Sequence, residues 1–134
     1  MFCQQPTPYN RYMPPLRIEL ATLRQIVIVT LTGDFVRPSC LELRDVLKPL
    51  IEEGFRCFVI DFNASQMDEA GCGEFVSTYT TVTNLGGQIA IKRNQLFRDL
   101  ERDAQRLRLY VFDTFSTIED AVEWLEENCR EREA

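Results

Sequence analysis

The sequence contains no histidine. The commonest general base near neutral pH and the commonest metal ligand are therefore missing, which excludes histidine-based triad hydrolases and histidine-bound zinc sites. No two cysteines are spaced as CxxC, and the odd number of cysteines favours neither a disulfide framework nor a thiolate metal cluster. We therefore expect no metal, no cofactor and unpaired thiols in a reducing cytoplasm. The five cysteines are Cys3, Cys40, Cys57, Cys72 and Cys129.

Long apolar runs and an excess of positive charge are also missing. No run approaches the length needed to cross a bilayer, so we expect no membrane insertion. The formal net charge of −6 disfavours nucleic acid, whose phosphates an acidic surface repels. What is present, 134 residues of which 45% are hydrophobic, predicts one domain with its own core. We expect a flexible, proline-rich leader over residues 1–15, a domain over 16–128 and a frayed tail over 129–134.

The hydrophobic periodicity predicts alternating strands and helices. Period-two and compact apolar runs indicate strands, and apolar stripes at helical spacing indicate helices. Ser39-x-x-Glu42 and Ser116-x-x-Glu119 have the form of capping boxes at two helix starts. The fold class predicted is a single α/β domain with a mixed, mainly parallel sheet of about five strands and about four helices. The predicted strands are 16–23, 25–31, 57–62, 88–91 and 109–112, and the predicted helices are 39–54, 68–84, 94–106 and one beginning at 116.

The stretch from Cys57 to Gly73 is the centre of this arrangement. Its apolar strand leads through a short polar loop to Asp68, which stands where a helix N-cap is expected, followed by Glu69. Both carboxylates suit the positive end of a helix dipole, and capping alone explains each at about 1 kcal/mol. The junction is therefore either a docking or ligand site or simply a well-capped helix.

The element order and four short motifs resemble the STAS domain, and the anti-sigma factor antagonists within it. The motifs are G-D-F after the second strand, V-I-D-F in the third, D-E-A-G-C-G at the junction and G-G before the fourth. The resemblance extends roughly from Leu16 to Glu127. It implies a non-enzymatic bacterial regulator in the cytoplasm that switches protein partners, such as a kinase-type anti-sigma factor.

In that family the junction usually reads D-S-S-G, and the second serine is phosphorylated by the kinase-type partner. Here Asp68 and Gly71 match the frame, Glu69 replaces the first serine, and Ala70 stands at the phosphoacceptor position. Alanine has no hydroxyl, so the resemblance implies docking without this switch. Ser65, Ser77 and Thr78 are nearby hydroxyls that a shifted switch could use, Ser65 foremost. The family also often carries an aspartate where this chain has Val36.

The resemblance implies a docking face made of the loop at 33–39, the loop at 63–71 and the start of the following helix. We expect Glu69→Lys and Gly71→Trp to weaken partner binding while the fold stays intact. The alternative is a STAS-like scaffold, or a subunit that binds a small anionic ligand, in a larger transporter or sensor assembly. The candidate partner-binding residues are Asp34, Val36, Ser39, Asp68, Glu69, Ala70, Gly71 and Glu74.

Overall fold

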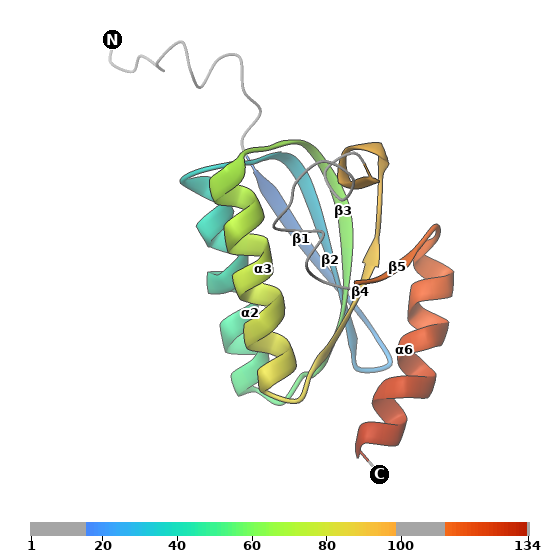
Figure 1. Cartoon of the computed structure of the whole chain (residues 1–134). Coiled ribbons are helices and arrows are strands. Elements are labelled where there is room, and N and C mark those ends of the chain that lie inside the picture. Colours follow the sequence, from blue (N-terminus) through green and yellow to red (C-terminus); the bar gives the residue numbers. More distant parts are fainter. Residues whose placement is uncertain (1–15, 99–111, 134) are drawn as a thin grey trace, which may run out of the picture.

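In the computed structural model, the described residues are 16–98 and 112–133, and they form one sheet covered by helices on both faces (Figure 1). The sheet has five strands in the order β1-β2-β3-β4-β5. β1 runs antiparallel to β2, and the remaining neighbours are parallel, which confirms the predicted mixed, mainly parallel α/β fold. The strands are β1 (Arg17–Leu23), β2 (Ile26–Phe35), β3 (Cys57–Met67), β4 (Gln88–Lys92) and β5 (Asp113–Phe115).

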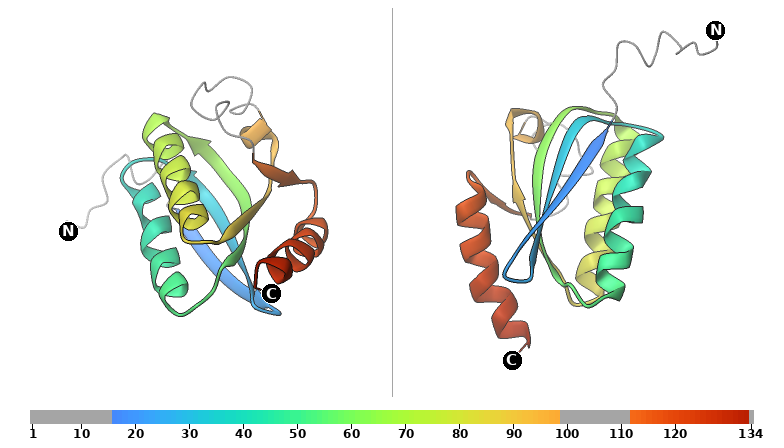
Figure 2. Two further views of the ribbon diagram at one scale, coloured as in Figure 1. Left: turned by 60° about the horizontal axis from the view of Figure 1, so that its bottom comes forward. Right: turned by 180° about the vertical axis from the view of Figure 1, so that it is seen from behind.

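The helices form two layers. η1 (Ser39–Leu41), α2 (Glu42–Glu52) and α3 (Glu69–Asn84) lie on one face of the sheet, and α6 (Ile118–Glu133) lies on the other (Figure 2). A further helical turn lies at residues 95–98. Parallel strands joined by helices must have their faces covered, which explains why β3 is a nearly continuous apolar run at its start.

Each layer has its own hydrophobic core. Under α2 and α3 the core is dominated by phenylalanines whose rings meet edge to face, for example Phe62 and Phe75 with centroids 5.5 Å apart. Such pairs stabilise a core beyond the area they bury. The core under α6 is smaller and consists mainly of aliphatic residues from β2, β3 and α6.

A two-residue turn joins β1 to β2, as the pairing of Leu23 with Ile26 requires. Both turn residues have positive φ, 52° at Arg24 and 73° at Gln25, as in a type I′ hairpin turn. Asparagine followed by glycine would be the usual choice there. Strand periodicity predicts the two strands, whereas the residues of the turn give no signal for a hairpin.

Replacing Gln25 by glycine is therefore expected to stabilise the protein. A non-glycine residue in the left-handed region costs of order 1 kcal/mol, so we expect a gain of about 1 kcal/mol in the free energy of unfolding. Urea denaturation measures it. Gln66→Gly, inside β3 and outside the left-handed region, is the matched control and should lower stability by about 0.5–1 kcal/mol. A loss in both variants would contradict the strain at the turn.

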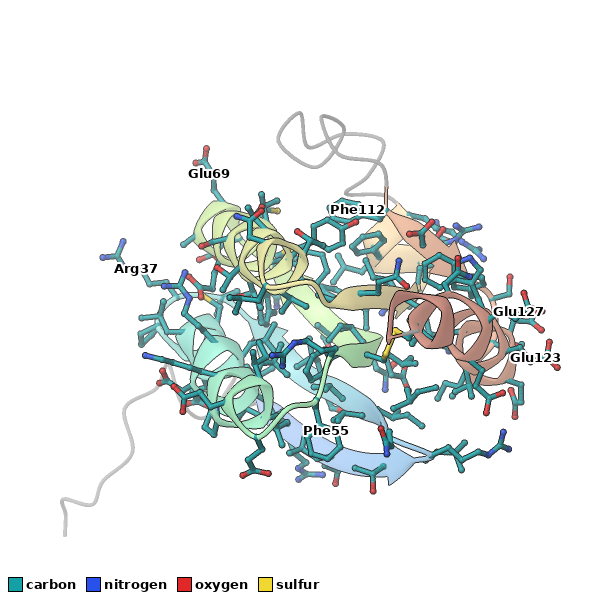
Figure 3. The ribbon with its side chains drawn as sticks, turned by 90° about the horizontal axis from the view of Figure 1, so that it is seen from below. Arg37, Phe55, Glu69, Phe112, Glu123 and Glu127 are labelled. Carbon is teal, nitrogen blue, oxygen red and sulfur yellow. A yellow bond between two sulfur atoms is a disulfide. The ribbon has the colours of Figure 1, made fainter. Side chains whose placement is uncertain are left out.

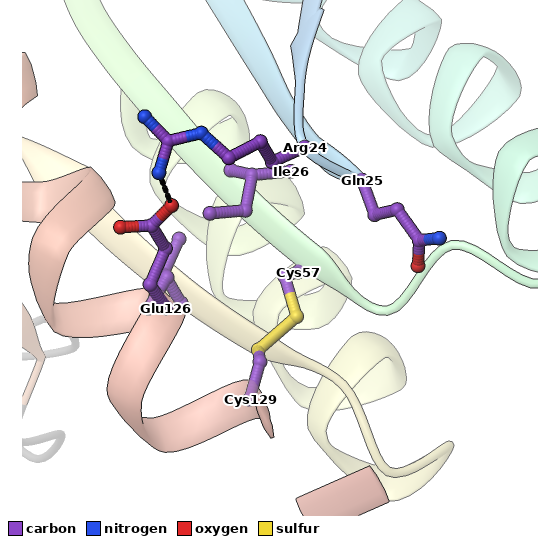
Figure 4. Close-up of a pocket in the computed structure, with 7 residues that line it drawn as sticks. Arg24, Gln25, Ile26, Cys57, Glu126 and Cys129 are labelled. Atoms are coloured by element: carbon purple, nitrogen blue, oxygen red, sulfur yellow. Dashed lines mark hydrogen bonds and ion pairs between the residues drawn. A yellow bond between two sulfur atoms is a disulfide. The ribbon is translucent and has the colours of Figure 1, made fainter. Parts of the chain in front are cut away.

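One covalent link and one ion pair hold α6 against the sheet. Cys57, at the start of β3, forms a disulfide with Cys129 in α6, and Arg24 of the hairpin turn pairs with Glu126 (Figure 4). The expectation of unpaired cysteines is thus wrong for this pair, whereas Cys40 and Cys72 are outside any disulfide. The spacing of 72 residues between the two cysteines carries no pattern, because only the fold brings them together. The cysteines therefore no longer argue for a reducing compartment.

Helix starts differ from the prediction in two places. At Ser39 the hydroxyl donates to the carbonyls of Asp34 and Val36, and no side chain caps η1 or α2, so the first capping box is wrong. At α6 the cap lies one residue later than predicted, because Thr117 Oγ1 accepts from the Asp120 amide at 3.1 Å.

The C-terminal boundaries also differ. Phe112 is not in a strand, and the last strand follows it at β5, while the rest of the predicted strand at 109–112 lies outside the described residues. We expected the ordered domain to end at residue 128, yet α6 continues to Glu133 and carries the buried Cys129. The leader at 1–15 and most of the predicted helix at 94–106 lie outside the described residues.

Candidate functional site

The candidate site lies at the edge of the sheet where β2 and β3 end. The two strands are parallel, so their carboxyl ends meet at one edge, and α3 begins there. Gly33 pairs with Ala64 and Asp34 with Gln66, so the register skips Ser65 and the sheet has a bulge. Bulges redirect the chain at strand ends, and here both strands turn away from the sheet toward α3 and η1.

The Asp68 carboxylate connects the β2–η1 loop to the start of α3. Its Oδ1 accepts from the Gly71 amide at 2.7 Å, which confirms the predicted N-cap of α3. Its Oδ2 accepts from the backbone amide of Arg37, which lies in the β2–η1 loop, at 3.3 Å. One carboxylate therefore caps the helix and fixes the position of a loop 31 residues away in sequence.

Gly71 lets the helix and the loop approach each other closely. A Cβ atom at this position would lie 2.1 Å from the Phe35 carbonyl oxygen and 3.0 Å from Met67 Cγ. Glycine is required here by space, with no need for an unusual φ. The expectation that Gly71→Trp leaves the fold intact is therefore wrong, because any side chain would push the loop away from α3.

A charge cluster around the buried carboxylate of Glu74 lies one turn further along α3. The guanidinium of Arg44 in α2 contacts both carboxylate oxygens of Glu74, at 3.0 Å from Nε and 3.1 Å from Nη2. The same guanidinium donates to Ser77 Oγ at 2.7 Å, and Thr78 donates to Glu74 at 3.4 Å. This fork geometry ties α2 to α3.

Burial raises the pKa of the nearby Cys40 thiol, and the carboxylates of Asp68 and Glu74 raise it further, so the thiol stays neutral.

The predicted docking residues separate into a buried group and an exposed group. The buried group supports the surface without being exposed on it, and it consists of Asp34, Val36, Gly71 and Glu74. Asp68 and Glu69 are exposed, whereas Ala70 and Ser39 are half-buried. Glu69 projects from the start of α3 into solvent, on the same side of the molecule as Arg37 (Figure 3).

Of the exposed residues of this surface, Arg37 lies in the predicted loop at 33–39 but was not singled out, and Leu41 was missed. Arg37 is bonded to Asp68 through its backbone, and Leu41 in η1 is 52% exposed although it is a large apolar residue. Leu41 could have been found from the sequence, because it is a large apolar residue in the first turn after Ser39. No sequence pattern singled out Arg37, because its place depends on the fold of the loop.

Asp34 has an unusual environment. Its residue is 1% exposed, and neither carboxylate oxygen has a hydrogen-bond partner in the part of the chain that the structure describes. Its main-chain carbonyl instead accepts from Ser39 Oγ at 3.3 Å. Asp34 therefore cannot be reached by a partner without movement of the loop.

The three hydroxyls near the junction differ in access. Ser65 is exposed at the bulge of β3, Ser77 is half-buried and bonded to Arg44, and Thr78 is buried and bonded to Glu74. Of the three, Ser65 is therefore the hydroxyl that another protein can reach without opening the fold.

A profile of the STAS domain matches residues 17–121, which is most of the chain. The chain belongs to the STAS domain family. Its first matched residue is the start of β1 and its last lies in α6, so every described strand of this STAS domain is covered. No curated protein matches the sequence.

Solved structures with the same fold include regulators and a transporter. An anti-sigma factor antagonist from Mycobacterium paratuberculosis has a TM-score of 0.67 at 14% identity, over 83% of this chain and 94% of its own. The unphosphorylated anti-sigma factor antagonist SpoIIAA has a TM-score of 0.63 at 17% identity, over 82% and 98%. The Slc26a9 anion transporter of mouse has a TM-score of 0.60 at 20% identity, over 80% of this STAS domain but only 18% of the transporter.

These likenesses show the fold that this STAS domain shares with antagonists and with one part of a transporter. SpoIIAA, a Bacillus cell fate determinant, is also known in a phosphorylated form of the same fold, with a TM-score of 0.61. Within the described residues, none of the helices has the length and apolar character to cross a membrane.

Proposed function

We propose that this STAS domain is a non-enzymatic regulator that docks a protein partner, such as a kinase-type anti-sigma factor, through the junction of the β2–η1 loop with α3. The observation that carries the proposal is the pair of hydrogen bonds that the Asp68 carboxylate accepts. These bonds join the β2–η1 loop and the start of α3 into one surface. On that surface Arg37, Leu41 and Glu69 are exposed. A surface with one apolar residue and charges of both signs suits protein recognition.

The proposed docking is constitutive at this surface. Ala70 lies in the first turn of α3, where a phosphate would gain backbone N–H contacts and would also place charge in the path of a partner. Ala70 cannot carry that phosphate. Glu69 is a fixed charge at the neighbouring position and carries less charge than a phosphate, so it does not reproduce the phosphorylated state.

The proposal includes a bacterial cytoplasmic setting in transcription control. A kinase-type partner needs ATP, and the fold matches antagonists that are named for sigma-factor regulation. In a reducing cytoplasm the link between Cys57 and Cys129 would open, and α6 would then be held by noncovalent contacts alone, namely its apolar packing and the ion pair of Glu126 with Arg24.

Glu69→Lys tests the docking surface. We expect it to weaken binding to a purified kinase-type anti-sigma factor from the same organism about ten-fold or more, because it reverses a charge in the interface. Titration calorimetry measures the affinity. Glu123→Lys makes the same change at an exposed position of α6, away from α3, and should leave the affinity unchanged. Equal affinities for wild type and Glu69→Lys would reject this surface.

A second candidate function is a scaffold or small anionic ligand subunit in a larger assembly. The likeness to part of Slc26a9 favours it, because a STAS fold there forms a small share of an anion transporter. Purification of the chain from its native cell in a complex with a membrane transporter, and without a kinase-type protein, would favour this alternative.

A further inference from the structure

A groove of about 600 Å³ lies between α2 and the C-terminal half of α3. Its floor is apolar: Leu47 and Ile51 of α2 and Val82 of α3 line it. Leu85, at the C-terminal end of α3, lines it as well and is 52% exposed. The volume falls within the usual range for small-molecule sites, and the half-exposed leucine offers apolar surface for a ligand to cover.

The groove collects positive charge on an acidic chain. In the part of the chain that the structure describes, its lining has three cations, Arg44, Lys48 and Arg56, against one acidic residue, Glu52, whereas the whole chain has a net charge of −6. Two of the three cations have structural partners as well. Arg44 is bound to Glu74, while Lys48 has no ion-pair partner among residues 16–98 and 112–133. Lys48 is thus the cation most available to an anion.

Arg56 is held at the groove by the main chain. Its Nη1 donates to the carbonyls of Ile51 and Phe55, at 2.8 and 2.9 Å, which fixes the guanidinium just past the end of α2. The backbone carbonyl of Arg56 also lies close under Gly87, where an added Cβ would be 2.7 Å away. The cation is therefore fixed before any ligand binds, and such preorganisation lowers the cost of binding.

We propose that the groove binds a free fatty acid, a single-chain anionic amphiphile. The carboxylate would pair with Lys48 and Arg56, and the acyl chain would lie on Leu47, Val82 and Leu85. Among the described residues that line the groove, none is aromatic for a base to stack on, and three cations are few for a polyphosphate, so a nucleotide fits this lining less well. The site shares no residue with the proposed docking surface, so it stands or falls independently of partner docking.

Dodecanoate, titrated into the full chain below its micelle concentration, tests the proposal by calorimetry. We expect one molecule bound per chain, and at least about ten-fold weaker binding of dodecyltrimethylammonium, which has the same chain length and the opposite charge. Lys48→Glu and Leu85→Glu should each weaken the binding of dodecanoate about ten-fold. Lys48→Glu removes a cation that pairs with the carboxylate, and Leu85→Glu removes an apolar contact with the acyl chain. Both positions are exposed, so the fold is retained.

Two matched variants control for charge and leucine loss elsewhere. Arg17→Glu and Leu23→Glu change exposed positions of β1 and should leave the affinity within about two-fold of wild type. The proposal is overturned by absence of binding, by equal binding of the cationic amphiphile, or by equal effects in the control variants. It is also overturned if an acidic amphipathic peptide binds in a manner sensitive to Lys48→Glu and dodecanoate does not.

Discussion

Gly71→Ala is expected to lower the free energy of unfolding by about 3 kcal/mol or more, a large effect for adding one methyl group. The new Cβ would lie 2.1 Å from the Phe35 carbonyl oxygen, a backbone atom that can retreat only if the end of β2 moves. Helix propensity acts in the opposite direction, because alanine is favoured over glycine inside a helix by roughly 1 kcal/mol. The clash is expected to exceed that gain, and urea denaturation measures the difference.

Thr81→Ala separates the two effects. Thr81 is an exposed residue of the same helix, so this variant adds an alanine without a clash and should change stability by about 0.5 kcal/mol or less. If Gly71→Ala is as stable as wild type, the close approach of α3 to the β2–η1 loop does not exist in solution.

Reduction of the disulfide between Cys57 and Cys129 is expected to remove roughly 4 kcal/mol of stability, the loop-closure value for two cysteines 72 residues apart. The open chain gains freedom in the unfolded state, while α6 in the folded state keeps the packing of Leu125 and its neighbours and the ion pair of Glu126 with Arg24. Urea denaturation with and without a phosphine reductant measures the loss.

Cys129→Ser provides the control for this measurement. The variant should be about as unstable without reductant as the reduced wild type, and reductant should not change it further. Cys40 and Cys72 are outside any disulfide, so among the described residues the reductant acts on the link between Cys57 and Cys129 alone. A wild-type protein whose stability is unaffected by reduction would show that the disulfide does not hold α6 to the sheet.

Local patterns were sufficient to predict most of the architecture. The apolar stripe at Leu43, Leu47 and Ile51 faces the sheet from α2, as helical spacing predicts. The compact run at 57–62 became the central strand, because only a strand covered on both faces needs apolar residues in succession. These features depend on neighbours in sequence, so the sequence contains the information for them.

Features that depend on distant residues could not be predicted in this way. Ser39 has the residue type and spacing of a capping box, yet its hydroxyl is used by the carbonyls of Asp34 and Val36 in the folded loop. The pairing of Cys57 with Cys129 likewise arises only when α6 packs on the far face.

The candidate site shows the same division. The Asp68 cap follows from local sequence, and it was predicted correctly. Whether a residue forms the surface or supports it from below follows from packing, so Asp34, Val36 and Glu74 were grouped with Glu69 although they are buried. The exposed Arg37, although inside the predicted loop at 33–39, was not singled out for the same reason.

The central claim is that this STAS domain stays docked to its partner because Ala70 cannot accept a phosphate. The direct measurement is the amount of complex with a purified kinase-type anti-sigma factor before and after ATP is added, for wild type and Ala70→Ser. We predict that ATP leaves the wild-type complex intact, and that Ala70→Ser becomes phosphorylated at residue 70 and dissociates. Loss of the wild-type complex on addition of ATP, with phosphate mapped to Ser65, Ser77 or Thr78, would contradict the account.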